Sequence, residues 1–153
     1  MHIRFKLVPE AVSSERVDGK DAILARLAER FAEVYGLDRT TVLDGLEERE
    51  ALGSTGFGRG VAIPHARIEG IKRPIAALLR LEEPVDYEAA DGMPVDLVFG
   101  LLSPANAGAM HLQALAAISR VVRDEETHRT LTEAPDGETL FALLTNATDR
   151  DAA

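Results

Sequence analysis

The chain has 153 residues, 46% of them hydrophobic, with no cysteine and with 17 basic against 26 acidic side chains, for a formal net charge of −9. A chain of this length can bury enough apolar surface for one domain, and the lack of thiols excludes disulfides, cysteine nucleophiles, iron–sulfur clusters and cysteine-ligated zinc. The negative charge opposes non-specific nucleic-acid binding, because the phosphate backbone would repel the protein.

The N-terminal residues carry no long apolar segment and no cleavage site of the kind that marks a secretory signal. No apolar run approaches the roughly 20 residues of a membrane span. No internal repeat or linker divides the chain. We therefore expect a cytoplasmic protein without membrane insertion, with a single domain over residues 1–153 and a core at about residues 10–146.

Helical spacing dominates the first third of the chain after a weak strand signal at Ala11–Val17. Apolar residues recur at helical spacing from Asp21 onward, and Gly36 provides a stop. Asp38 is a typical N-cap for a second helix that runs to about Ala51. Two successive helices are therefore predicted.

A glycine-rich loop follows, because residues 53–60 read Gly-Ser-Thr-Gly-Phe-Gly-Arg-Gly. A short strand at Val61–Ile63 comes next and is broken by Pro64. The loop lacks the Gly-Lys-Ser/Thr ending of a P-loop, and it precedes a strand where a dinucleotide-binding fingerprint follows one. Nucleotide binding is therefore not expected.

Two nearly continuous apolar runs, Ile75–Leu81 and Val95–Leu102, predict strands that are buried on both faces. Turn residues lie between them at Asp91-Gly92 and after them at residues 104–108.

Helices are predicted in the C-terminal third, one up to about Arg123 and two shorter ones at Glu125–Glu133 and Glu138–Asn146, with the last residues frayed. Strands flanked by runs of helices indicate an α+β fold in three layers, α/β/α. We expect a mixed central sheet of about four or five strands.

Histidine is the most informative residue type, because its ring nitrogens act as acid, base, nucleophile or ligand near neutral pH. His2 and His128 are expected to be ordinary solvated side chains. His65 follows a strand and a proline at the edge of the glycine-rich loop, where a reactive group is presented on rigid support; alternatively, it caps the strand and bonds a carbonyl. His111 lies in the first turn of a helix, where free N–H groups attract anions, unless it is a simple cap.

Positive charge is concentrated between residues 49 and 80. Two acidic residues, Glu50 and Glu69, stand there against six basic ones, so this window carries +4 and the remainder −13. The basic residues are Arg49, Arg59, Arg67, Lys72, Arg73 and Arg80. This distribution indicates a local anion site near His65, since arginine grips phosphate oxygens in a fork; a solvated basic face is the alternative.

Three separated motifs resemble a known family. They are the stretch from Arg49 to His65, the pair Glu83–Tyr87 and Asp91–Phe99, and His111-Leu112 before a helix. In this order they resemble the EIIA domains of the fructose/mannitol type in the bacterial phosphoenolpyruvate-dependent sugar phosphotransferase system. The resemblance covers roughly residues 10–146, and within the family it is greatest to the stand-alone nitrogen-related branch.

The resemblance implies a phosphocarrier, a phosphotransferase component and not a stand-alone enzyme, that needs neither cofactor nor metal. His65 matches the phosphorylated histidine, with Nε2 as the attacking atom, and Arg49 and His111 match the side chains that flank it. Loop N–H groups would supply further donors to the phosphate. The loop residues concerned are Ser54, Thr55 and Gly56.

The partners implied are a phosphorylated HPr-like or NPr-like donor and regulated targets in potassium transport, nitrogen metabolism or stress signalling. Ala66 stands where the family often has glycine, which leaves the preference for the donor open. One alternative is a sugar-permease EIIA that passes the phosphoryl group to an EIIB. A non-catalytic interaction module and a metal hydrolase using His65 and His111 are further alternatives, the latter lacking a third ligand at a recognisable spacing.

Overall fold

The computed structural model describes residues 4–152, with side chains for residues 4–148, so His2 lies outside the described residues. Within this range a six-stranded sheet is combined with five α-helices. The elements in chain order are η1 (Pro9–Ala11), β1 (Val12–Glu15), α1 (Lys20–Tyr35), α2 (Arg39–Ala51), β2 (Gly56–Gly58), β3 (Val61–Ala62), β4 (His65–Ile68), β5 (Ile75–Val85), β6 (Val95–Pro104), α3 (Ala109–Val122), α4 (Glu125–Thr132) and α5 (Gly137–Ala152).

The sheet is mixed, with the strand order β1-β5-β6-β3-β2. Strand β6 pairs antiparallel with β5 on one side and parallel with both β3 and β4 on the other. Val61 pairs with Leu97 and His65 with Leu101, so β3 and β4 keep one register along β6. Together β3 and β4 form one strand alongside β6 that is interrupted at Ile63-Pro64.

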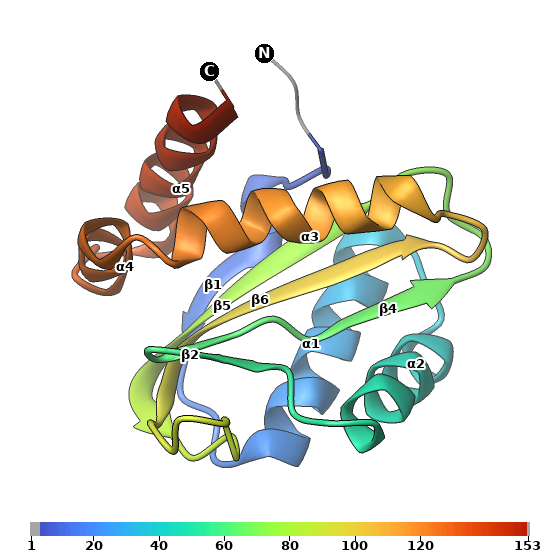
Figure 1. The fold of residues 1–153 in the computed structure, drawn as a ribbon, viewed down its shortest axis with the longest axis horizontal. Helices are drawn as coiled ribbons and strands as arrows, with labels where there is room; N and C mark the ends of the chain where they lie inside the picture. Colours follow the sequence, from blue (N-terminus) through green and yellow to red (C-terminus); the bar gives the residue numbers. More distant parts are fainter. Residues whose placement is uncertain (1–3, 153) are drawn as a thin grey trace.

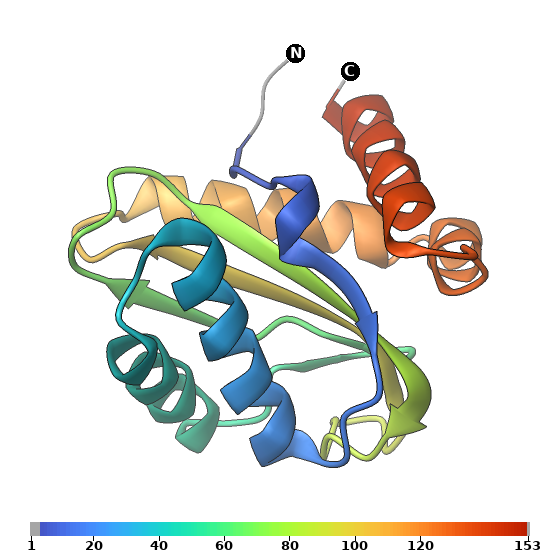
Figure 2. The same ribbon diagram turned by 180° about the vertical axis from the view of Figure 1, so that it is seen from behind.

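Helices cover both faces of the sheet, as expected for a three-layer fold (Figures 1 and 2). In β6, Leu97, Phe99 and Leu101 pack in the core beneath α3 and α5. The alternate residues Val98 and Leu102 pack in the core beneath α1 and α2. Because side chains alternate between the two faces of a strand, successive residues of β6 pack into two separate cores.

The predicted three-layer α/β/α architecture with a mixed sheet is confirmed, but the sheet has six strands and not four or five. Strand β2 lies inside the predicted glycine-rich loop, and β4 reads only His-Ala-Arg-Ile. Neither is long enough for a periodicity of its own, and both exist because β3 and β6 supply their hydrogen bonds. Helix α5 also continues to Ala152, where frayed residues were expected.

Helix α2 begins as predicted, because the Asp38 carboxylate accepts a hydrogen bond from the Thr41 N–H. Such a cap contributes about 1 kcal/mol. Helix α1 ends at Gly36 in the left-handed conformation, with a φ of 71°. None of the helices in residues 4–152 is long and apolar enough to cross a bilayer.

Candidate functional site

Three elements bring the predicted residues Arg49, His65 and His111 together. Arg49 lies in the last turn of α2, His65 is the first residue of β4, and His111 lies in the first turn of α3. The two imidazole rings are 5.6 Å apart between centroids. The Arg49 Nε donates a hydrogen bond of 3.2 Å to the His65 Nε2.

Close packing of α2 on β4 makes this approach feasible. Ala66 faces Gly45 of α2, where a Cβ on the glycine would lie 3.2 Å from the alanine Cβ. A Cβ at position 45 would therefore require Ala66 or the helix that carries Arg49 to shift by a few tenths of an ångström. Helix α3 starts just beyond the end of β6, the partner strand of β4, so its first turn reaches the same end of the sheet (Figure 1).

The tautomer of His65 follows from its two partners. Its Nδ1 lies 2.7 Å from the carbonyl oxygen of Ile63, which can only accept a hydrogen bond, so Nδ1 carries the proton. The Arg49 guanidinium can only donate, so Nε2 presents a lone pair. His65 thus bonds a carbonyl, as in the capping alternative, and still has its other nitrogen turned to the arginine.

Electrostatics keep the His65 ring neutral. Burial lowers the pKa of His65, the Ile63 carbonyl opposes this shift, and the cations Arg49 and Arg67 lower the pKa further. The ring is therefore uncharged at neutral pH, and its unprotonated Nε2, which accepts the Arg49 hydrogen bond in this structure, can act as a nucleophile once the guanidinium turns to an incoming anion.

His111 is buried, with 5% of its surface exposed. Its Nδ1 lies 2.6 Å from the hydroxyl oxygen of Ser103, at the end of β6. Burial lowers the pKa of His111 to about 4, and the cation Arg67 and the neighbouring His65 add to the shift. Sequence reasoning missed Ser103, although a polar residue at the end of an apolar strand was a usable signal.

Arg49 is held in place by a second contact. Its Nη1 donates a hydrogen bond of 2.9 Å to the carbonyl oxygen of Gly53 in the glycine-rich loop. Among the described residues, its Nη2 amino group makes no hydrogen bond and is available to an anion. The loop therefore aims the guanidinium at His65.

A groove of about 600 Å³ contains the three residues. Arg67 adds a second cation to its lining, and both histidines face into it. Leu52 and Leu112 also line the groove, although 85% and 63% of their surfaces are exposed. Against one acidic residue, Glu48, the groove sets two neutral imidazoles, two cations and an apolar rim, which suits a negatively charged group carried by another protein.

Only part of the predicted basic window reaches this groove. Arg80 is buried elsewhere, where it donates hydrogen bonds to the Ser14 hydroxyl and to the Leu131 carbonyl. Arg59 forms an ion pair of 3.5 Å with Glu125. The +4 of this window is therefore not gathered on one surface, because neighbouring residues of a strand or loop point in different directions.

The predicted phosphate loop uses its own donors internally. The Thr55 N–H and hydroxyl both donate to the Glu50 carboxylate, and the Gly56 N–H donates to the Ser54 hydroxyl oxygen at 3.1 Å. None of the three residues Ser54, Thr55 and Gly56 lines the groove with His65. Their direct contact with a phosphate stays a prediction, and the observed role of the loop is to support Arg49.

Glu50 anchors this loop. The Lys20 Nζ lies 2.8 Å from its carboxylate, which also accepts from Thr55. Burial by itself would raise the pKa of Glu50, but the bonds from Lys20 and Thr55 outweigh it and hold the pKa below its usual value. Glu50 is therefore ionised at neutral pH and fully engaged.

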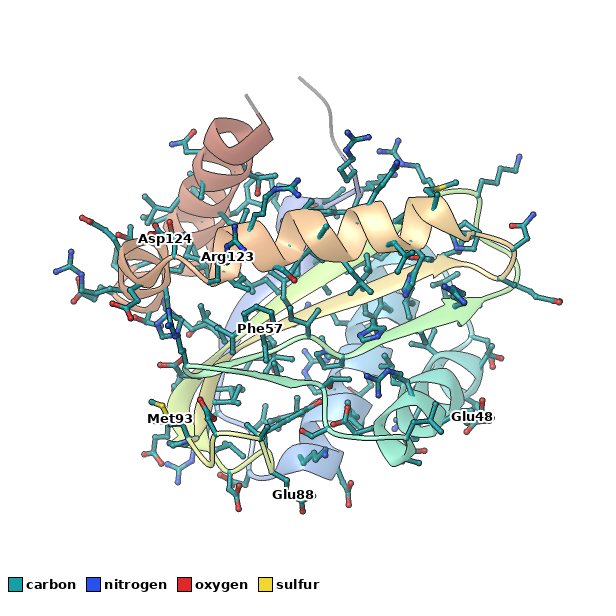
Figure 3. The ribbon with its side chains drawn as sticks, in the orientation of Figure 1. Glu48, Phe57, Glu88, Met93, Arg123 and Asp124 are labelled. Atoms are coloured by element: carbon teal, nitrogen blue, oxygen red, sulfur yellow. The ribbon has the colours of Figure 1, made fainter. Side chains whose placement is uncertain are left out.

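Gly56 is required by a close contact with the loop between β5 and β6. A Cβ at Gly56 would lie 2.8 Å from the Cα of Ala89. Figure 3 shows Glu88 and Met93 on this same loop, whereas Phe57 of β2 lies on the side of its strand toward α3. The glycine in the motif is thus explained by packing between two loops.

His128 is not the solvated side chain expected. Its Nε2 lies 2.8 Å from the Asp96 carboxylate, and both side chains are about three-quarters buried. The pair joins α4 to the start of β6 next to Gly60. Sequence could not reveal this contact, because 32 positions separate the two residues.

A second hollow, of about 590 Å³, lies beside α1 and carries a different charge. Lys20 is its one basic residue; its acidic lining residues are Asp18, Asp21, Glu47, Glu50, Asp86 and Glu88. Such a surface repels phosphate, which favours the histidine groove as the functional site. Among the described side chains, no group of three or more histidine, aspartate and glutamate residues is placed to hold a metal ion.

Comparison with known proteins identifies similar sequences and folds. Residues 9–147 match the family described as "Phosphoenolpyruvate-dependent sugar phosphotransferase system, EIIA 2". A nitrogen regulatory protein of Bradyrhizobium diazoefficiens is 40% identical over 145 residues, which cover 94% of this chain and 95% of the relative. A fructose-specific EIIA component of Haloferax volcanii is 40% identical over 107 residues, 70% of each chain. The crystal structure of the nitrogen regulatory protein IIA-Ntr from Neisseria meningitidis superposes with a TM-score of 0.83 at 34% identity, covering 90% of this chain and 95% of that chain.

Proposed function

The chain belongs to the EIIA type 2 family of the phosphoenolpyruvate-dependent sugar phosphotransferase system, and from this premise we propose that it carries a phosphoryl group on the Nε2 of His65. The observation that carries the proposal is the neutral His65 ring, with its Nδ1 proton held by the Ile63 carbonyl and its Nε2 lone pair beside Arg49. A fixed lone pair next to a cation is what a nucleophile for an anionic phosphorus centre requires.

In the transfer step, the His65 Nε2 lone pair forms a bond to phosphorus as the bond between phosphorus and the donor's imidazole nitrogen breaks. The electron pair of the broken bond returns to the donor ring. His65 keeps its Nδ1 proton, so the new phosphohistidine ring is cationic, and the adjacent phosphoryl oxygens balance that charge. The protein contributes position and electrostatic stabilisation, and no proton needs to leave.

Arg49 and His111 have complementary roles. Arg49 faces His65 at 3.2 Å and neutralises charge on the equatorial phosphoryl oxygens. His111, with its ring centroid 5.6 Å from that of His65, donates a hydrogen bond from its groove-facing nitrogen. Each preorganised donor of this kind is worth about 10²- to 10³-fold in rate.

We assign the chain to the nitrogen-regulatory branch, on the strength of its 40% identity to the Bradyrhizobium diazoefficiens protein over nearly the whole of both chains. On this proposal the protein acts in the cytoplasm, accepts the phosphoryl group from an HPr-like or NPr-like carrier, and regulates partner proteins by its phosphorylation state. Targets in potassium transport, nitrogen metabolism or stress regulation fit this role.

A sugar-permease EIIA is the second candidate, and the similarity to the fructose-specific component of Haloferax volcanii favours it. In that role the phosphoryl group passes from His65 to an EIIB. Adding a fructose-type EIIB to the phosphorylated protein separates the two functions: rapid loss of the label supports the permease role, and retention of the label supports the regulatory one.

The carrier function is tested by incubating the protein with phosphoenolpyruvate, enzyme I and an HPr-type carrier. We expect one acid-labile phosphoryl group by intact mass on the wild type and none on His65→Ala. Arg49→Ala should slow transfer by about 10²- to 10³-fold. Arg39→Ala, on the exposed start of the same helix and in an ion pair of 3.8 Å with Glu29, is the matched control and should transfer normally.

The outcomes separate the alternatives. An unlabelled wild type would support a non-catalytic interaction module and refute the carrier function. A persistent label on His65→Ala would place the phosphoryl group on another residue. Equal rates for the Arg49 and Arg39 variants would remove Arg49 from the site.

A further inference from the structure

The hydroxyl of Ser103 is a buried polar group in direct contact with His111. Ser103 is completely buried near the carboxyl end of β6, which runs beneath α3 (Figure 1). It pairs with Arg67 in the sheet, while His65 pairs with Leu101 two residues earlier, so the side chains of all four lie on one face. Its Oγ lies 2.6 Å from the His111 Nδ1.

This hydrogen bond can be arranged in two ways. Either the Ser103 hydroxyl donates to an unprotonated Nδ1, or a protonated Nδ1 donates to the hydroxyl oxygen. The low pKa of His111, about 4, means that the neutral ring carries one proton only. The direction of the bond therefore decides which ring nitrogen of His111 holds it.

Burial selects between the arrangements. Among the described residues, His111 Nδ1 is the single hydrogen-bond partner of the Ser103 hydroxyl. If Nδ1 donated, the hydroxyl proton would be left without an acceptor at a position with 0% exposure. An unsatisfied buried donor is costly, so the hydroxyl donates and the His111 proton sits on Nε2.

We propose that Ser103 is a positioning residue that holds His111 in the Nε2–H tautomer, so that the neutral ring donates a hydrogen bond to the phosphoryl group received by His65. His65 has the opposite tautomer, with its proton on Nδ1. Two adjacent neutral histidines therefore offer different groups to the same phosphoryl: a lone pair from one and an N–H from the other. The role of Ser103 in phosphoryl transfer rests on the proposed carrier function, whereas the tautomer of His111 does not depend on it.

Nitrogen-15 NMR of the histidine rings at neutral pH tests the tautomer without any transfer reaction. We expect His111 to have a protonated Nε2 and an unprotonated Nδ1, and His65 to show the reverse. In Ser103→Ala the His111 preference should be lost while that of His65 persists. A protonated Nδ1 on His111 in the wild type would overturn the proposal, whatever the kinetics.

Transfer kinetics from a phosphorylated HPr-type carrier test the consequence. Ser103→Ala should lower the maximal rate by about tenfold without changing the KM for the carrier, because the hydroxyl acts on the transition state through His111. Ser103→Thr retains the hydroxyl and should restore both the rate and the tautomer. Ser14→Ala, which removes a hydroxyl bonded to Arg80 outside the groove, is the matched control and should behave as wild type.

The experiments distinguish a wrong role for Ser103 from a wrong carrier function. An unchanged rate and tautomer in Ser103→Ala, with normal labelling of the wild type, would refute the role of Ser103 alone. An unlabelled wild type would refute the carrier function but leave the NMR result to decide the tautomer. Should Ser103→Thr fold poorly because of its extra methyl group, the contrast between Ser103→Ala and Ser14→Ala still decides.

Discussion

The buried neutral state of His111 predicts a specific loss of stability in mild acid. Its pKa falls from the usual 6.5 to about 4 in the folded protein, so the unfolded chain binds this proton first as the pH drops. The stabilisation is complete above about pH 6.5 and is lost as the pH falls toward 4. The perturbation we choose is His111→Asn, because the asparagine amide can still bond the Ser103 hydroxyl but does not titrate.

The magnitude follows from the two pKa values. At about pH 5 the unfolded imidazole is almost fully protonated, whereas His111 in the folded protein is mostly neutral. The difference in proton uptake between about pH 7.5 and about pH 5 lowers the free energy of unfolding by about 2 kcal/mol. For a chain of this size, this corresponds to about 4–8 °C in Tm.

Urea denaturation followed by circular dichroism at these two pH values provides the assay. The drop in the free energy of unfolding should be about 2 kcal/mol smaller in His111→Asn than in the wild type. His65, whose pKa is also lowered, contributes in the same direction in both proteins. Carboxylates with lowered pKa values lose their contributions at lower pH, and equally in both. Identical pH dependence in the two proteins would refute a buried, neutral His111.

Two further substitutions test the support of the site. Glu50→Gln removes the anion 2.8 Å from the Lys20 ammonium and should lower the free energy of unfolding by about 1–3 kcal/mol in urea denaturation at neutral pH; an unchanged midpoint would contradict this role. Gly56→Ala should cost about 1–3 kcal/mol, because its Cβ would lie 2.8 Å from the Ala89 Cα. Gly137→Ala, whose Cβ would meet its nearest neighbour at 3.5 Å, is the control, and equal effects of the two alanines would refute the packing argument.

The long periodic elements could be predicted because their signal is local. The spacing from Asp21 to Gly36 and the cap at Asp38 define α1 and α2, and the apolar run from Val95 defines β6. Strand β4 could not be found in this way. Its four residues have too short a pattern, and they form a strand because β6 pairs with them from 36 positions away.

The candidate site was predicted through motifs and not through physical reasoning alone. Charge counting pointed to a basic window, but Arg80 is buried and donates to the Leu131 carbonyl of α4, and Arg59 pairs with Glu125. His128 was expected in solvent and bonds Asp96. Side-chain direction and long-range pairing decide these outcomes, and neither is encoded in the neighbouring residues.

The sequence by itself determined that the protein is a cysteine-free, acidic α/β/α domain with a motif that ends at His65. Only the tertiary structure decided which nitrogen of that histidine is unprotonated, because Nδ1 meets the Ile63 carbonyl and Nε2 meets the Arg49 guanidinium of α2. The proton on His111 is set in the same way by Ser103, across the interface of strand and helix. The sequence thus supplies the two histidines, and in the proposed function the direction of their hydrogen bonds in the fold makes His65 the acceptor of the phosphoryl group and His111 a donor to it.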